Sequence, residues 1–94
     1  MTVYNGDTIT LACRLFAELS EYTIVTWQKK RKVLSYNNDL IESNGRLGIE
    51  QMVDSKEWRL TVRNVTMGDE GIWTCTTNID TLSTSVDLVV IGTY

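Results

Sequence analysis

The chain has 94 residues, a net charge of −3, two cysteines and no histidine. A chain of this length forms one domain at most, so we expect a single domain over residues 1–94. A mildly acidic chain without histidine is not suited to nucleic-acid binding, to most metal sites or to histidine-dependent catalysis, so we expect a non-enzymatic protein with no catalytic, cofactor-binding or metal-binding residues.

Short runs of alternating apolar and polar residues follow one another from the N-terminus, with Gly, Asn, Asp and Ser between them. In chain order the runs cover residues 8–15, 25–28, 47–49, 58–63, 72–76 and 86–90. Alternation with a period of two is typical of strands that bury one face, and no segment is long and apolar at helical spacing. We therefore expect an all-β protein in which antiparallel strands form a sandwich.

The strongest motif joins the two cysteines to a tryptophan that lies between them. Cys75 closes the string Asp69-Glu70-Gly71-Ile72-Trp73-Thr74-Cys75, and Cys13 and Trp27 precede it. This pattern resembles the core of an immunoglobulin-superfamily domain, and the resemblance covers nearly the whole chain. It implies an immunoglobulin-like Greek-key β-sandwich of V-type or I-type. The implied strands cover residues 2–5, 8–16, 23–31, 32–36, 46–52, 57–64, 71–78 and 82–91, and a short additional strand near 39–42 stays open.

The resemblance also assigns structural roles to individual residues. It implies one disulfide, Cys13–Cys75, between the two sheets, and a core that includes Trp27, Leu60 and Trp73. Trp73 departs from the family pattern, in which a tyrosine at this position donates its hydroxyl to the backbone. Because an indole has only an N–H donor, we expect that hydrogen bond to be absent or replaced.

An ion pair is implied at one end of the sandwich. In domains that resemble this chain, the aspartate of the motif pairs with an arginine at the start of the strand over 46–52, and these residues are Asp69 and Arg46 here. The alternative is that both side chains are exposed, where such a pair contributes only about 0–1 kcal/mol. We expect the ion pair.

Two features of the sequence predict where the protein is located relative to the cell. A structural disulfide persists in oxidising surroundings, and Asn64-Val65-Thr66 is an N-glycosylation sequon, unless the triplet occurs by chance. We expect an extracellular domain, at the cell surface or secreted, with Asn64 glycosylated. Because Met1 leads directly into strand-like sequence, we expect an excised fragment, the membrane-distal domain of a larger ectodomain whose membrane anchor lies elsewhere.

Local phrases such as Val25-Thr26-Trp27-Gln28-Lys29-Lys30 resemble membrane-distal domains of nectins, nectin-like molecules and immune costimulatory ligands. The resemblance implies a recognition module for cell adhesion or receptor–ligand binding, with another cell-surface, immunoglobulin-like protein as partner. Whether the partner is a different protein or a second copy, as in a homodimer, is open. A structural spacer in a multi-domain array and a secreted immune or neural modulator are the alternative roles.

The resembling proteins bind partners through the sheet formed by the strands over 23–31, 32–36, 71–78 and 82–91, known as the GFCC′ sheet. If Trp27 and Trp73 point inward, the neighbouring side chains point outward from this sheet. The candidate partner-binding residues are Gln28, Lys30, Tyr36, Thr74, Thr76, Ile79 and Leu82. The basic run over 29–32 is either a solvated strand end or a basic rim that steers an acidic partner.

Overall fold

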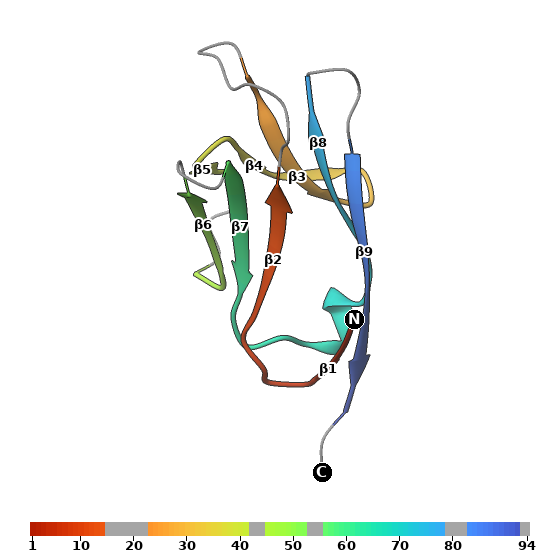
Figure 1. Ribbon diagram of the computed structural model, residues 1–94. Helices are drawn as coiled ribbons and strands as arrows, with labels where there is room; N and C mark the ends of the chain where they lie inside the picture. Colours follow the sequence, from red (N-terminus) through yellow and green to blue (C-terminus); the bar gives the residue numbers. More distant parts are fainter. Residues whose placement is uncertain (15–22, 42–44, 53–55, 79–82, 93–94) are drawn as a thin grey trace.

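A computed structural model describes residues 1–14, 23–41, 45–52, 56–78 and 83–92. Its strands form two sheets that face each other, with β2, β6 and β7 on one side and β8 and β9 on the other (Figure 1). The elements are β1 (Thr2–Tyr4), β2 (Ile9–Arg14), β3 (Val25–Lys29), β4 (Lys32–Tyr36), β5 (Asp39–Leu40), β6 (Leu47–Met52), β7 (Glu57–Val62), the 3₁₀ helix η1 (Met67–Asp69), β8 (Gly71–Thr77) and β9 (Ser83–Ile91).

The larger sheet has six strands in the order β1-β9-β8-β3-β4-β5, and the smaller has three in the order β2-β7-β6. Neighbouring strands pair antiparallel except β1 and β9, which run parallel. This arrangement confirms the predicted all-β immunoglobulin-like sandwich. In the described part of the chain, no helix is long and apolar enough to span a membrane.

The strand boundaries differ from the predicted ones mainly at turns. The open prediction near 39–42 corresponds to β5, which holds only two residues. The predicted strand over 57–64 ends at Val62, because Asn64 has a positive φ of 51° that no strand accommodates. Residues 15, 16 and 82, which belong to two predicted strands, lie outside the described residues.

The core lies between the sheets and is crossed by one disulfide. Cys13 on β2 and Cys75 on β8 are bonded, with an S–S distance of 2.06 Å, so the bond joins the two sheets as the motif implied. Trp27 and Leu60 are fully buried, and Trp73 is 2% exposed. Complete burial of a large apolar side chain contributes about 1.5–3 kcal/mol, so each of these positions stabilises the sandwich substantially.

One corner of the sandwich is held by Asp69, at the end of η1. The Arg46 guanidinium donates two hydrogen bonds to its carboxylate, from Nη1 to Oδ2 at 3.0 Å and from Nη2 to Oδ1 at 2.7 Å, so the expected ion pair is present in bidentate form. The backbone N–H of Thr66 donates to the same carboxylate at 2.8 Å. Trp73 donates its indole N–H to the Asp69 carbonyl oxygen at 2.9 Å. The indole thus replaces the hydroxyl that a tyrosine would supply.

Candidate binding surface

The outward side of the six-stranded sheet presents its side chains in rows, because opposite residues of paired strands share a face. The buried Trp27 and Cys75 pair across β3 and β8, and Trp73 pairs with Val86 across β8 and β9, so their strand neighbours point outward. We call this outward surface the front face. Its rows are Tyr36, Thr26, Thr76 and Ser83; Val33, Gln28, Thr74 and Ser85; and Ile72 with Asp87.

Hydroxyl groups occupy the centre of the front face and bond to one another. The Oγ1 atoms of Thr26 and Thr76 lie 2.6 Å apart, and Thr74 Oγ1 lies 3.2 Å from Ser85 Oγ. Both pairs join adjacent strands. The centre is therefore polar but uncharged, and its hydroxyls retain lone pairs that can accept further hydrogen bonds from a partner.

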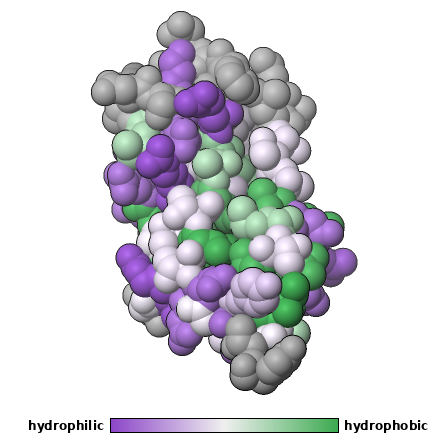
Figure 2. Space-filling model, turned by 60° about the horizontal axis from the view of Figure 1, so that its bottom comes forward, coloured by the Kyte–Doolittle hydropathy of each residue, from purple (hydrophilic) through white to green (hydrophobic). Residues whose placement is uncertain are grey.

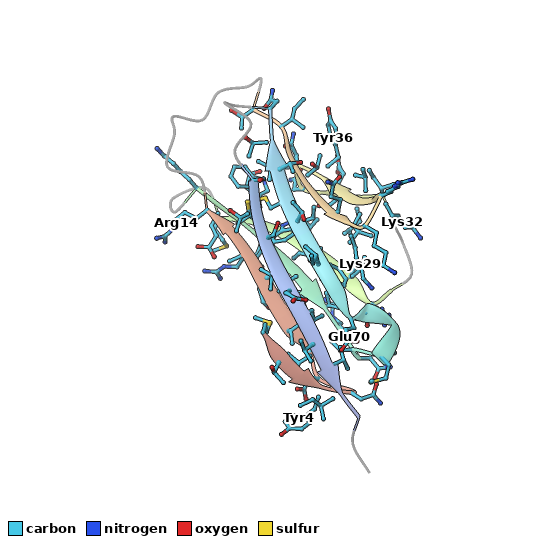
Figure 3. All side chains as sticks on the ribbon, turned by 90° about the vertical axis from the view of Figure 1, so that its right-hand side faces the viewer. Tyr4, Arg14, Lys29, Lys32, Tyr36 and Glu70 are labelled. Atoms are coloured by element: carbon cyan, nitrogen blue, oxygen red, sulfur yellow. A yellow bond between two sulfur atoms is a disulfide. The ribbon has the colours of Figure 1, made fainter. Side chains whose placement is uncertain are left out.

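Exposed apolar side chains flank this centre on two sides. Val33 and Tyr36 on β4, 37% and 46% exposed, form one side together with the neighbouring Ile41. On the other side Ile72 of β8 lies near the lower half of β9, where Val89 and Ile91 pair with Thr2 and Tyr4 of β1. Figure 2, which brings this lower end of the molecule forward, shows apolar side chains gathered there. In Figure 3 Tyr36 and Tyr4 lie at opposite ends of the sheet.

The structure shows different roles for residues of the basic run over 29–32. Lys29 turns back onto the fold, where its Nζ donates to the Gly68 carbonyl at 2.6 Å and lies 5.3 Å from the centre of the Trp73 ring. Partial burial lowers the pKa of Lys29, although the charge of Asp69 opposes this shift. Lys30 adopts a positive φ of 58° in the tight turn between β3 and β4 and is exposed. Lys29 is thus a structural residue, whereas Lys30 lies at the rim of the front face.

The smaller sheet shows a different surface, in which charges pair with one another. Glu57 on β7 accepts a hydrogen bond from Arg59 Nε at 2.7 Å and lies 3.7 Å from Arg14 Nη2 of β2. The hydrogen bond from Arg59 to Glu57, together with the Glu57 charge, raises the pKa of Arg59. This outward surface of β2, β7 and β6, the back face, is therefore charged and internally neutralised.

Four of the predicted partner-binding residues lie together on the front face: Gln28, Tyr36, Thr74 and Thr76. Lys30 lies at the adjacent turn, and Ile79 and Leu82 lie outside the described residues. The prediction missed Val33. A β-bulge between Trp27 and Gln28 shifts the register so that Val33 lies opposite Gln28, and no feature of the alternation in the sequence indicates that shift.

Comparisons with known proteins agree with the fold. The family model "Immunoglobulin domain" matches residues 1–86. IgLON family member 5 from human and from mouse is 30% identical over 92 residues, which are 95% of this chain but 26% of that protein, so the chain spans about a quarter of the length of these relatives.

Three solved structures illustrate the structural similarity. Dpr1 IG1 bound to DIP-eta IG1 is 26% identical, with a TM-score of 0.85, and the match covers 97% of this chain and 87% of that chain. Dpr2 Ig1-Ig2 in complex with DIP-Theta Ig1-Ig3 is 30% identical, with a TM-score of 0.85 and coverage of 98% and 42%. The Ig1 domain of mouse SynCAM 2, at 23% identity, a TM-score of 0.82 and coverage of 99% and 91%, shares the fold.

Proposed function

Because the chain belongs to the immunoglobulin domain family, we propose that it is a non-catalytic recognition module that binds another immunoglobulin-like domain through its front face. The module would act in cell adhesion or receptor–ligand binding, as the membrane-distal domain of a cell-surface or secreted protein. Two similar structures support the class of partner, since the Ig domains of Dpr1 and Dpr2 are in complexes with Ig domains of DIP-eta and DIP-Theta.

The contrast between the two faces carries the proposal. The centre of a protein–protein interface is depleted of charge and enriched in aromatic residues, with a polar rim. The front face matches the depletion of charge, because hydroxyls and an amide occupy its centre, and the exposed Tyr36 and Val33 supply apolar area beside them. The back face does not fit it, because Arg59 and Glu57 would have to be desolvated on binding.

The area of the front face indicates whether it can form a stable interface by itself. The rows hold ten outward side chains from four strands. At about 4.8 Å between strands and about 6.8 Å between successive outward side chains along a strand, they cover on the order of 300 Å². A stable interface covers about 800 Å² on each partner. We therefore infer that contacts extend beyond the rows, to the rim turn at Lys30 and to the exposed Ile41 beside β5.

A matched pair of substitutions tests the proposal. Thr76 lies beside Thr26 on the front face, and Thr61 lies beside Thr10 on the back face, each as a cross-strand threonine pair. We expect Thr76→Arg to reduce binding at least tenfold in a surface plasmon resonance panel of immunoglobulin ectodomains that includes this chain and IgLON family member 5. Thr61→Arg should leave binding unchanged. Loss of binding in Thr61→Arg with full binding in Thr76→Arg would contradict the front-face assignment.

Sedimentation of the chain alone over a concentration series then separates the two kinds of partner. Self-association that Thr76→Arg abolishes indicates a homodimer through the front face. A monomer at high concentration indicates a different protein as partner. Binding to no ectodomain, combined with a monomeric chain, favours the alternative role as a structural spacer.

A further inference from the structure

Asn64 differs from Asn37 and Asn78 in what its side chain does. The carboxamide oxygen of Asn37 accepts the backbone N–H of Val25 at 2.9 Å, and that of Asn78 accepts the N–H of Ile24 at 2.7 Å. The Asn64 side chain makes no such bond within the described part of the chain, and the residue is exposed. It is also the only asparagine in an Asn-x-Ser/Thr triplet. The fold thus leaves this carboxamide available for other chemistry.

The backbone on either side of Asn64 is fixed, so its side chain has a defined exit from the surface. Val65 is fully buried; its N–H donates to the Asp7 carbonyl at 2.9 Å and its carbonyl accepts from Gly6 at 2.7 Å. Arg63 donates to the Arg46 carbonyl at 2.7 Å. Asn64 itself has a φ of 51°, a left-handed conformation that asparagine tolerates better than most residues. This places the carboxamide on the outside of the corner between β7 and η1.

Thr66, the hydroxyl residue of the triplet, is also exposed but is tethered in the folded chain. Its backbone N–H donates to Asp69 Oδ2 at 2.8 Å, and its Oγ1 lies 3.4 Å from the same oxygen. The carboxylate is also bonded to Arg46. An enzyme that must bind both the asparagine and the threonine therefore meets exposed side chains joined by a backbone that the fold holds in place, because Val65 between them is buried and bonded at both its N–H and its carbonyl.

We propose that Asn64 carries an N-linked glycan, and that the glycan is attached before the corner around η1 folds. In this group transfer the carboxamide nitrogen of Asn64 forms a bond to C1 of a polyprenyl-diphosphate-linked oligosaccharide. The bond from C1 to the diphosphate oxygen breaks, the polyprenyl diphosphate leaves with the electron pair, and the amide loses one proton. The product is compatible with the folded corner, because the modified side chain points to solvent.

The position of the glycan has a consequence for the surface of the molecule. Asn64 follows β7, a strand of the smaller sheet, and its carbonyl accepts a bond from Arg46 at 3.4 Å. A glycan there covers the lower corner beside the back face. It leaves the rows of the front face open, which are carried by strands of the other sheet.

Translation of the chain behind a signal sequence into microsomes tests the modification. We expect a product whose added mass is removed by peptide N-glycosidase, and the same product from Thr66→Ser, which keeps a hydroxyl. Asn64→Gln and Thr66→Ala should show no added mass, and Asn38→Gln, which changes an exposed asparagine outside any triplet, should behave like the unmodified sequence. An unmodified product from the original sequence, with the disulfide formed, would overturn the proposal.

A second arm tests the order of events. The folded, oxidised protein and the same protein reduced and unfolded in urea before dilution are offered to solubilised oligosaccharyltransferase with lipid-linked oligosaccharide. We expect at least tenfold more modification of the unfolded chain. Equal modification of both forms would refute attachment before folding while leaving the site itself intact. Neither arm of the experiment needs a protein partner. The outcomes of both arms are therefore independent of whether the front face is the binding surface.

Discussion

Replacing Arg46 by methionine tests how much the Asp69 corner contributes to stability. The substitution removes two charge-assisted hydrogen bonds to the Asp69 carboxylate but keeps an apolar stem of similar length. The carboxylate is left with the backbone N–H of Thr66 as its main donor. Asp69→Asn instead removes the negative charge of the ion pair, and it also weakens the hydrogen bond that the Thr66 N–H donates.

The magnitude follows from the exposure of the two side chains. An exposed ion pair contributes about 0–1 kcal/mol, and breaking a buried one costs about 3–5 kcal/mol. Here the Arg46 side chain is 29% exposed and that of Asp69 is 10% exposed, which places the pair between these limits. We expect Arg46→Met to lower the free energy of unfolding by about 2 kcal/mol. Asp69→Asn should cost about 3 kcal/mol, because the hydrogen bond to Thr66 loses its charge.

Urea unfolding and calorimetry of both single variants and the double variant measure these values. A loss of 2 kcal/mol corresponds to a fall in Tm of about 8–16 °C for a domain of this size. The double variant should cost about 1–2 kcal/mol less than the sum of the singles, because the two residues are in direct contact. Arg31→Met, on the exposed turn, is the control and should change stability by less than about 0.5 kcal/mol. A loss below about 0.5 kcal/mol in Arg46→Met, or strict additivity, would refute the reasoning.

Three further predictions concern the core and its edge. Replacing both Cys13 and Cys75 by alanine should lower the free energy of unfolding by about 4 kcal/mol, because the bond closes a loop with a sequence separation of 62; a loss below about 1 kcal/mol in urea would contradict this. Trp73→Phe keeps an aromatic ring but leaves the Asp69 carbonyl without its donor, and calorimetry should show a loss of about 1–3 kcal/mol, whereas unchanged stability would argue against the hydrogen bond. The Lys29 pKa, measured by NMR titration, should lie below the ordinary lysine value because of partial burial, and should fall further in Asp69→Asn, which removes a charge that raises it. Between the Lys29 pKa of the folded chain and the higher one of the unfolded chain, the unfolded chain holds more protons than the folded chain. Stability should therefore rise with pH in that interval relative to Lys29→Arg, and a fall would contradict a lowered pKa in the folded chain.

Local motifs predicted the core well because each of its elements has a signature in the sequence. Cys13, Trp27 and Cys75 lie on alternating strands that the period-two pattern marks, and their buried positions follow from it. The front face could be placed for the same reason, since Thr74 and Thr76 alternate with buried residues of β8. Prediction therefore succeeded where side-chain direction depends on local alternation.

Features that depend on contacts between distant segments could not be predicted in this way. The parallel pairing of β1 with β9 is set by how the N-terminal segment packs against the opposite end of the chain. The sequence did not predict which group accepts the hydrogen bond of the Trp73 indole. The acceptor is a carbonyl of the η1 turn, and a single 3₁₀ turn has no periodic signature. Glu70 is a further case. The pairing of β9 with β8 ends at Leu88 and Gly71, and beyond it the Glu70 carboxylate accepts the N–H of Val90 at 3.0 Å on the side where β8 would otherwise continue.

The pairing of β1 with β9 predicts how the domain would respond to mechanical load. The Met1 ammonium donates to the Asp87 carbonyl at 2.9 Å, Val89 donates to Met1 at 2.8 Å, and Asn5 donates to Ile91 at 2.8 Å. Because the strands run parallel, opposed forces on Met1 and on the chain beyond Ile91 act along the strands (Figure 1). Such shear stretches these hydrogen bonds together, whereas force that peels a hairpin from its end breaks them one at a time. Opposed forces on the two ends of the domain would therefore be resisted first at this short pair of strands.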